Sequence, residues 1–352
     1  MPTISLELAG VPFLVETQST RLVELYTDYY RYYSPSVIDG LDSGISDNLQ
    51  VTPKLRLILE TVEELPAPYH HSQPGWRLIS RTGVLELWER SEPESEQYKY
   101  LFQAGCATFQ VDPRRALIRG KIAPTAFSYP HILANTYSMF PVLLVLRQLG
   151  LYHLHAAAAI SPRGRVWLIP GSQRSGKTTI VTALGIAGWR PVSDDSLLLI
   201  SGAESEKDHS GEIVALKKYF HLGNDLLSRW QDLDVMVRGH SYLDRTCVDA
   251  IGFFGQPGER EEKIKRVDHL LMPRITGKPQ SRAGAALASD GLLMLGEQSV
   301  FLQLWRAHTS RQWRWLESIA RGATCFSLES GTDLLEEPRL IAAMLEEIEA
   351  AN

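Results

Sequence analysis

The segment that decides the fold is residues 166–188, which read VWLIPGSQRSGKTTIVTALGIAG. It begins with an apolar run over residues 166–169, typical of a buried strand, and ends with a helical pattern that Gly188 closes. Between the two stands the motif GxxxxGK[ST], which starts at Gly171 and ends at Thr178. The motif requires the order strand, glycine-rich loop and helix, so the segment predicts a phosphate-binding loop in an α/β unit.

Each part of this loop has a chemical reason. Gly171 and Gly176 let the backbone curl, so that successive amide N–H groups point into one concavity at a helix N-terminus. Lys177 adds a positive charge against the β- and γ-phosphates, and the Thr178 hydroxyl is a ligand for Mg²⁺. The expected nucleotide-binding residues are Gly171, Ser172, Gln173, Arg174, Ser175, Gly176, Lys177, Thr178 and Thr179. The alternative is a glycine-rich turn that only caps a helix.

A pair of acidic residues, Asp194 and Asp195, follows the helix of this motif. Its spacing from Lys177 fits a helix of about three turns and a return to the next strand. The carboxylates then reach the γ-phosphate, where one holds Mg²⁺ and the other accepts a proton from an attacking hydroxyl. The alternative is that the pair only caps or solvates the end of a strand.

Four segments follow one another between about residues 150 and 200: LHAAAA, GSQRSGKTT, GWRPVSDD and LLLI. This order resembles the catalytic domain of the bacterial HPr serine kinase/phosphorylase family, especially its shorter HPr kinase-like relatives. The resemblance implies the nucleotide-binding fold of phosphoenolpyruvate carboxykinase, a mixed and strongly twisted sheet wrapped by helices. It also implies ATP with Mg²⁺ as cofactors and suggests homo-oligomers.

The resemblance further implies roles for individual residues. His155, at the head of the strand before the loop, lies near the γ-phosphate and assists the catalytic aspartate. The first aspartate, Asp194, is the base toward a serine hydroxyl and acts with Lys177. The second, Asp195, supports Mg²⁺ together with Thr178.

His155 also has two interpretations that do not depend on the resemblance. On a strand it shares a face with His153, so the two histidines form a conceivable metal site. The other interpretation is a buried histidine held by a hydrogen bond.

The chain departs from this family in two places. A string like LEVRGLGI, which serves phosphorylase chemistry, is absent, and EIVALKKYFHLGNDL, with Lys217 and Lys218, occupies that region. We therefore expect kinase and not phosphorylase chemistry. The N-terminal region does not match the usual N-terminal domain of the family, which argues against HPr itself as the acceptor. The resemblance to the shorter HPr kinase-like proteins implies instead a serine of another protein or of a precursor peptide.

Two other functions are open at this point: a small-metabolite kinase with a phosphate loop, and a non-catalytic regulator that senses ATP. A GTPase lacks support because no NKxD-type string appears. Candidate residues for binding the acceptor are Phe253, Phe254, Gln256 and Pro257 in a loop, and the basic residues Arg114, Arg115, Arg119 and Lys121. The alternatives are an irregular surface turn for the loop and an ordinary solvated surface for the basic residues.

The segments before residue 130 read mostly as short strands, such as ISLELAGVPFLVE and YLFQAGCATFQVD. From there the period becomes helical, and HILANTYSMFPVLLVLRQLG predicts a buried helix closed by Gly150. HLHAAAAI and RVWLI, joined by SPRG, predict a hairpin. We expect a β-rich unit over residues 1–128, for substrate or partner recognition, and an α/β catalytic domain over residues 129–352.

The 352 residues carry 36 Lys+Arg and 41 Asp+Glu, for a formal net charge of −5. This mild acidity argues against nucleic acid or an anionic membrane as a partner. The three cysteines are far apart and odd in number, which does not fit a disulfide framework. The first residues lack a secretion signal and no apolar run reaches a membrane-spanning length, so we expect a cytoplasmic protein.

Overall fold

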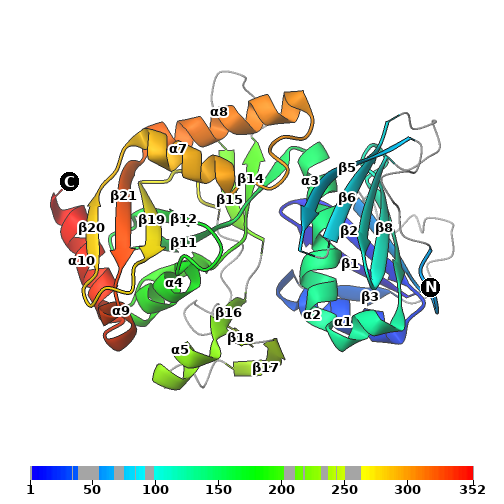
Figure 1. Ribbon diagram of the computed structural model, residues 1–352, viewed down its shortest axis with the longest axis horizontal. Coiled ribbons are helices and arrows are strands. Elements are labelled where there is room, and N and C mark those ends of the chain that lie inside the picture. The colour runs from blue at the N-terminus through cyan, green and yellow to red at the C-terminus, as the bar shows by residue number, and fades with distance from the viewer. Residues whose placement is uncertain are drawn as a thin grey trace. The chain divides into compact units, whose positions relative to one another are not determined.

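The computed structural model describes residues 2–33, 35–38, 55–66, 75–83, 85–91, 99–201, 211–216, 219–230, 237–242, 244–249 and 263–351. Over these residues the chain is mixed α/β, with several sheets and helices (Figure 1). It divides into two compact units, Met1–Leu149 and Gly150–Asn352.

The first unit is built on a nine-stranded sheet with the strand order β3-β1-β2-β4-β9-β8-β7-β6-β5. Its strands are β1 (Thr3–Leu8), β2 (Val11–Thr17), β3 (Ser36–Ile38), β4 (Leu55–Thr61), β5 (Trp76–Thr82), β6 (Leu85–Arg90), β7 (Tyr100–Ala104), β8 (Ala107–Asp112) and β9 (Leu117–Ile122). β4 runs parallel to β2 and β9, and the other neighbours are antiparallel. Alternate residues of β2 are buried, as the period of a half-buried strand requires. The expected strands of this region are confirmed.

Short helices complete the first unit. They are α1 (Thr20–Tyr29), η1 (Arg31–Tyr33), η2 (Pro124–Ser128), α2 (Pro130–Ile132), the π-helical η3 (Leu133–Tyr137) and α3 (Met139–Gln148). The Ser19 hydroxyl accepts a hydrogen bond from the Leu22 N–H and so caps α1. Gly150, with φ +85°, follows α3 in the left-handed conformation that ends many helices.

The division between the units falls after Leu149, whereas the sequence analysis set it after residue 128. The helices after residue 130 belong to the first unit because they pack on its tyrosine-rich helix. The Tyr26 hydroxyl is hydrogen-bonded to the Ser138 hydroxyl, and the Tyr29 hydroxyl donates to Asn135 Oδ1 at 3.0 Å. The helical pattern was correctly predicted, but it does not reveal which sheet the helices cover.

The second unit contains three sheets. The six-stranded sheet has the order β13-β11-β12-β19-β21-β20 and consists of β11 (Ala156–Ile160), β12 (Val166–Pro170), β13 (Arg190–Ser193), β19 (His269–Ile275), β20 (Arg282–Ala285) and β21 (Thr324–Ser330). The other two are β10-β14-β15, from β10 (Leu151–Leu154), β14 (Leu197–Ser201) and β15 (Gly211–Ala215), and β16-β18-β17, from β16 (Phe220–Gly223), β17 (Val237–Tyr242) and β18 (Arg245–Val248). β11 and β12 form the predicted antiparallel hairpin, and β12 pairs in parallel with β19.

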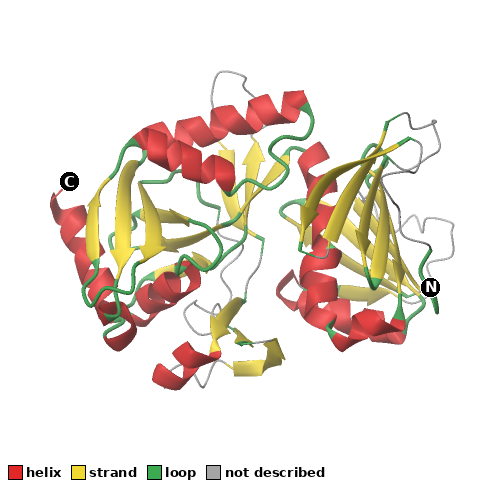
Figure 2. Cartoon of the chain, in the orientation of Figure 1, coloured by secondary structure: helices red, strands yellow, loops and turns green. Residues whose placement is uncertain are grey.

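Helices cover both faces of the six-stranded sheet (Figure 2). They are α4 (Lys177–Ile186), α7 (Ala288–Glu297), α8 (Arg306–Gly322), α9 (Asp333–Glu336) and α10 (Arg339–Ala351), while α5 (Asn224–Arg229) follows β16. The side chains of β11 alternate between two buried clusters. Ala157 and Ala159 belong to the cluster with α4 and α10, and Ala156 and Ala158 to the cluster with α7 and α8.

Among the helices that the structure describes, none is both long and apolar enough to cross a lipid bilayer.

Candidate functional site

The glycine-rich loop, residues 171–176, connects β12 to α4, as the sequence analysis expects for this segment. Two of its residues have left-handed backbone conformations: Gly176 with φ +97° and Arg174 with φ +64°. Gly171 is required for a different reason, since a Cβ there would lie 2.6 Å from Ser175 Oγ. The loop is therefore tightly wound, and its glycines allow both the winding and the close approach.

The loop leads directly into the N-terminus of α4. Gly176 is the N-cap residue and provides no side-chain hydrogen bond to the helix, so no side-chain cap occupies this end. The first N–H groups of a helix have no partner within the helix and carry partial positive charge. Such an end binds anions, and phosphate above all.

Lys177 is the first residue of α4, and its side chain turns back onto the loop. It is 5 % exposed, and its ammonium donates to the carbonyl oxygens of Gly171 at 2.6 Å and Ser172 at 3.0 Å. Its Nζ also lies 3.0 Å from Nε2 of His155, the residue directly before β11. A neutral His155 imidazole with its proton on Nδ1 accepts this hydrogen bond.

The pKa of Lys177 is brought close to the physiological range, although the ammonium form still predominates at pH 7. Burial lowers the pKa of Lys177 from 10.5 to about 8, against the opposing effect of the carboxylates of Asp195 and Asp194. The positive charge of Arg245 also lowers it. A phosphate group bound nearby would favour the ammonium form and raise this pKa.

The two neighbouring aspartates occupy different environments. Asp194 is 1 % exposed, and its Oδ2 accepts hydrogen bonds from the backbone N–H of His221 at 3.2 Å and from Thr178 Oγ1 at 3.4 Å. Asp195 is half-buried and lines an open cleft. One carboxylate is thus fixed beside the start of α4, while the other faces a space that a second molecule can enter.

This cleft has a volume of about 500 Å³. It brings together most of the predicted site residues, namely His155, Gln173, Arg174, Ser175, Gly176, Lys177, Thr178, Thr179 and Asp195. Gly171 and Ser172 act through their carbonyl oxygens on Lys177, and Asp194 acts through Thr178. The predicted phosphate loop and acidic pair therefore meet around one cleft.

The cleft also contains residues that the sequence analysis did not identify: His221, Asp225, Asp244, Arg245, Ile275 and Leu335. They come from β16, α5, β18, β19, α9 and the turn before β18, far apart in sequence. Neither a motif nor a regular period marks them, so only the pairing of distant strands brings them to the loop.

The other candidates do not line the cleft, belong to the first unit, or fall outside the described residues. His153 Nε2 is hydrogen-bonded to Ser196 Oγ at 2.7 Å and does not line the cleft. Arg114, Arg115, Arg119 and Lys121 belong to the first unit. Lys217, Lys218, Phe253, Phe254, Gln256 and Pro257 lie outside the described residues.

The oxygen atoms beside the start of α4 fit a magnesium ion. The Thr178 hydroxyl and the Asp194 carboxylate are hard oxygen ligands, and their oxygens lie 3.4 Å apart. Over the described ranges, no group of three or more His, Cys, Asp or Glu residues is placed to hold a metal by itself. Mg²⁺ usually binds through one or two carboxylates, water and substrate phosphates, so this sparse set of ligands suits it.

No protein-family model matches the chain, and no curated protein matches its sequence. The residues of the cleft and their geometry are therefore the basis on which a function is proposed.

Proposed function

We propose that the chain is an ATP/Mg²⁺-dependent kinase that transfers the γ-phosphate to a serine hydroxyl of a protein or precursor peptide, as HPr kinase-like proteins do. One observation carries this proposal: a buried lysine, an uncapped helix N-terminus and two aspartates in different environments meet around a single cleft. A structural turn that only caps a helix needs neither the buried Lys177 nor the neighbouring carboxylates.

Binding of the triphosphate follows from the loop. The N–H groups at the start of α4 and the ammonium of the buried Lys177 supply positive charge beside the cleft, and burial strengthens the attraction of this lysine for an anion. Arg245, which lines the same cleft, adds a second positive charge. Mg²⁺, when bound by Thr178 and a carboxylate, neutralises charge on the phosphates.

Transfer needs a base that the acceptor can reach. The serine oxygen attacks the γ-phosphorus, the bond from that phosphorus to the β,γ-bridging oxygen breaks, and ADP leaves. The proton of the serine hydroxyl passes to a carboxylate. Asp195 suits this step because it lines the cleft, whereas Asp194 is buried and already accepts hydrogen bonds from Thr178 and His221.

The geometry thus favours Asp195 as the base and Asp194 as the carboxylate on the metal side. The family resemblance assigns these two roles the other way round. His155 has a positioning role in either assignment, because its Nε2 holds the Lys177 ammonium. The two assignments make opposite predictions for the two Asp→Asn variants.

The experiment measures binding of Mg²⁺-ATP by calorimetry and transfer to co-expressed serine-containing peptides by mass spectrometry. Asp195→Asn should keep ATP affinity within about threefold and lower transfer by about 10²- to 10⁴-fold, the usual contribution of a general base. Asp194→Asn should weaken the binding of Mg²⁺-ATP. Asp28→Asn, on an exposed side chain of α1, is the matched control and should change neither.

If instead Asp194→Asn loses transfer but keeps ATP affinity, and Asp195→Asn weakens the binding of Mg²⁺-ATP, the two aspartates have the roles that the resemblance implies. ATP binding with no transfer to any hydroxyl acceptor would indicate a nucleotide-sensing regulator and contradict the kinase. Transfer to small metabolites but not to peptides would identify a small-molecule kinase. Failure of the wild-type chain to bind Mg²⁺-ATP would overturn the proposal as a whole.

A further inference from the structure

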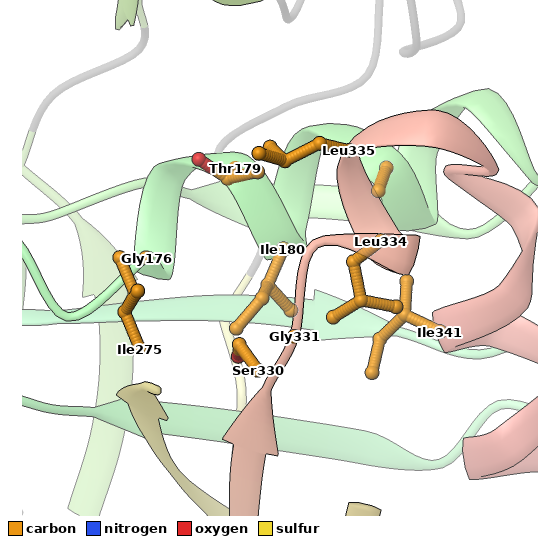
Figure 3. Close-up of a pocket in the computed structure, with 10 residues that line it drawn as sticks. Gly176, Thr179, Ile180, Ile275, Ser330, Gly331, Leu334, Leu335 and Ile341 are labelled. Carbon is orange, nitrogen blue, oxygen red and sulfur yellow. The ribbon is translucent and has the colours of Figure 1, made fainter. Parts of the chain in front are cut away.

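A small apolar pocket lies beside the glycine-rich loop (Figure 3). Its volume is about 70 Å³, and its walls include Ile180 and Ala183 from α4, Leu334 from α9 and Ile341 from α10. These side chains come from three separate helices and face the same space. An apolar pocket of this kind binds a flat or aliphatic group, and leaves charged groups outside.

One buried hydroxyl lines the pocket. Ser330, the last residue of β21, is 7 % exposed, and its Oγ is buried with no hydrogen-bond partner among the described residues. A buried polar group without a partner destabilises the protein, because it has lost its hydrogen bonds to water. A ligand that offers a hydrogen bond within the pocket would satisfy it.

The pocket shares part of its lining with the cleft. Gly176, Thr179, Ile275 and Leu335 line both the pocket and the cleft. Lys177, which faces the phosphates, and Asp195, the proposed base for the acceptor hydroxyl, line the cleft but not the pocket. A group bound in the pocket therefore lies beside the loop but away from Lys177 and Asp195, which mark the reacting end of the cleft.

The far wall of the pocket is held by hydrogen bonds. The Gly331 N–H donates to Ser281 Oγ at 2.8 Å, and the Ser281 hydroxyl and N–H both donate to the carboxylate of Asp333 at the start of α9. A Cβ on Gly331 would lie 2.6 Å from the carbonyl carbon of Gln280. This close packing fixes Ser330 and Leu334 in place, so the pocket is formed before any ligand binds.

We propose that this pocket receives the purine base of the nucleotide whose phosphates bind at the glycine-rich loop. The inference rests on the proposed function and extends it to the base. A purine has two apolar faces and polar edges, which match aliphatic walls and a single hydroxyl. Ile275, 58 % exposed at the rim, covers the part of the ring system that the small pocket leaves outside.

An apolar side chain of the acceptor peptide is the competing occupant. The acceptor hydroxyl must lie next to the reacting phosphorus and to Asp195, and Asp195 does not line the pocket. The base, in contrast, is attached at the opposite end of the triphosphate. The position of the pocket along the loop therefore favours the base.

The test compares ATP with inorganic tripolyphosphate, which has the phosphates and lacks the base. Both are titrated calorimetrically with Mg²⁺ into the wild-type chain and four variants, one of which, Ser330→Ala, removes the buried hydroxyl. Ala183→Leu fills the pocket, Ile275→Ala shortens its exposed rim with little risk to folding, and Leu293→Ala removes an exposed leucine on α7 as the matched control. Circular dichroism and thermal melting verify folding of each.

We expect the wild-type chain to bind ATP at least about tenfold more tightly than tripolyphosphate. Ala183→Leu should remove this difference, and Ile275→Ala should weaken ATP binding about three- to fivefold, with tripolyphosphate binding unchanged within twofold in both. The control should bind both ligands like the wild type. Ser330→Ala should weaken ATP binding by a factor of two or three.

Equal affinity of the wild-type chain for the two ligands would overturn the inference, while leaving phosphate binding and the kinase intact. Equal weakening of both ligands by the folded Ile275→Ala variant would also overturn it. An unchanged ATP affinity with a raised KM for the acceptor peptide would assign the pocket to the peptide. If the wild type binds neither ligand, the proposed function itself fails.

Discussion

The reacting end of the cleft, around Lys177 and Asp195, and the adjoining apolar pocket, the apolar end of the site, are built in different ways. At the reacting end, Lys177 and Asp195 lie within a short stretch of sequence that one motif and one acidic pair identify. At the apolar end, Ile180, Ser330 and Ile341 come from segments far apart in the chain. Removing a charged group from water costs free energy unless partners fixed nearby pair with it, whereas an apolar wall needs only nearby carbon atoms. The difference predicts that substitutions at the reacting end abolish function, and those at the apolar end alter affinity.

Lys177→Met should have the largest effect. It removes the positive charge of the reacting end and keeps most of the side-chain volume, so the chain should fold. We expect transfer to fall by at least about 10³-fold and ATP affinity by more than tenfold, as when a preorganised charge is lost. Lys265→Met, an exposed lysine of the same unit, is the control. Near-normal transfer by Lys177→Met would show that transfer does not depend on the positive charge of Lys177.

Gly171→Ala should have the next largest effect. The new Cβ would lie 2.6 Å from Ser175 Oγ, so either the Ser175 side chain or the loop must shift, and a shift of the loop would move the carbonyl oxygen that holds Lys177. We expect ATP affinity to fall by about tenfold in calorimetric titrations. The double variant with Ser175→Ala removes the closest atom and should recover part of the affinity. If the double variant recovers no ATP affinity, the contact with Ser175 is not the cause of the loss.

The pH dependence of ATP binding should show a smaller change. Because the pKa of Lys177 is about 8 in the free protein, its ammonium is lost as the pH rises through 8, whereas bound phosphate favours the ammonium. We therefore expect ATP affinity to weaken up to about tenfold between pH 7 and 9, with proton uptake on binding near pH 8.5.

The same group has the opposite effect on stability. Between pH 8 and the ordinary lysine pKa of 10.5 the unfolded chain binds more protons at Lys177 than the folded chain, so this residue's contribution to the free energy of unfolding rises with pH. Below pH 8 both states are protonated and the contribution is constant. Denaturant titrations of the wild type and of Lys177→Met isolate it, and an identical pH dependence in both would exclude Lys177 as the source.

Ser330→Ala should have the smallest effect, and it tests the apolar end. Removing a buried hydroxyl without a described partner should raise the free energy of unfolding without nucleotide by about 1 kcal/mol. Thermal melting measures this change. Ser327→Ala, on the same strand, is the comparison, because the Ser327 hydroxyl is exposed and donates to the Gly284 carbonyl. A clear loss of stability in Ser330→Ala would show that the hydroxyl is already satisfied.

Local patterns account for what the sequence predicts correctly. The β11–β12 hairpin follows from two apolar runs around the turn SPRG, and α4 follows from the helical period after Lys177. The acidic pair lies beside the loop because a helix and a short return bring Asp194 back to Thr178. In each case the contact partners are close in sequence, so spacing alone is informative.

Long-range pairing accounts for what the sequence does not predict. β12 pairs in parallel with β19, and β19 with β21, across long connections, so no local pattern indicates which strands become neighbours. These pairings bring Ile275 and Ser330 beside α4. The same limit explains the unit boundary, since the helices after residue 130 have a clear period but no local mark of the sheet that they cover.

The four alanines of β11 have a consequence for how far this chain tolerates change. Each side chain ends at Cβ, and each is fully buried against helices on one face of the sheet or the other. A larger residue at Ala157 or Ala159 would push α4 outward. This shift would displace Lys177, the first residue of α4. Saturation mutagenesis should therefore find this strand among the least permissive segments, although none of its side chains could touch a ligand.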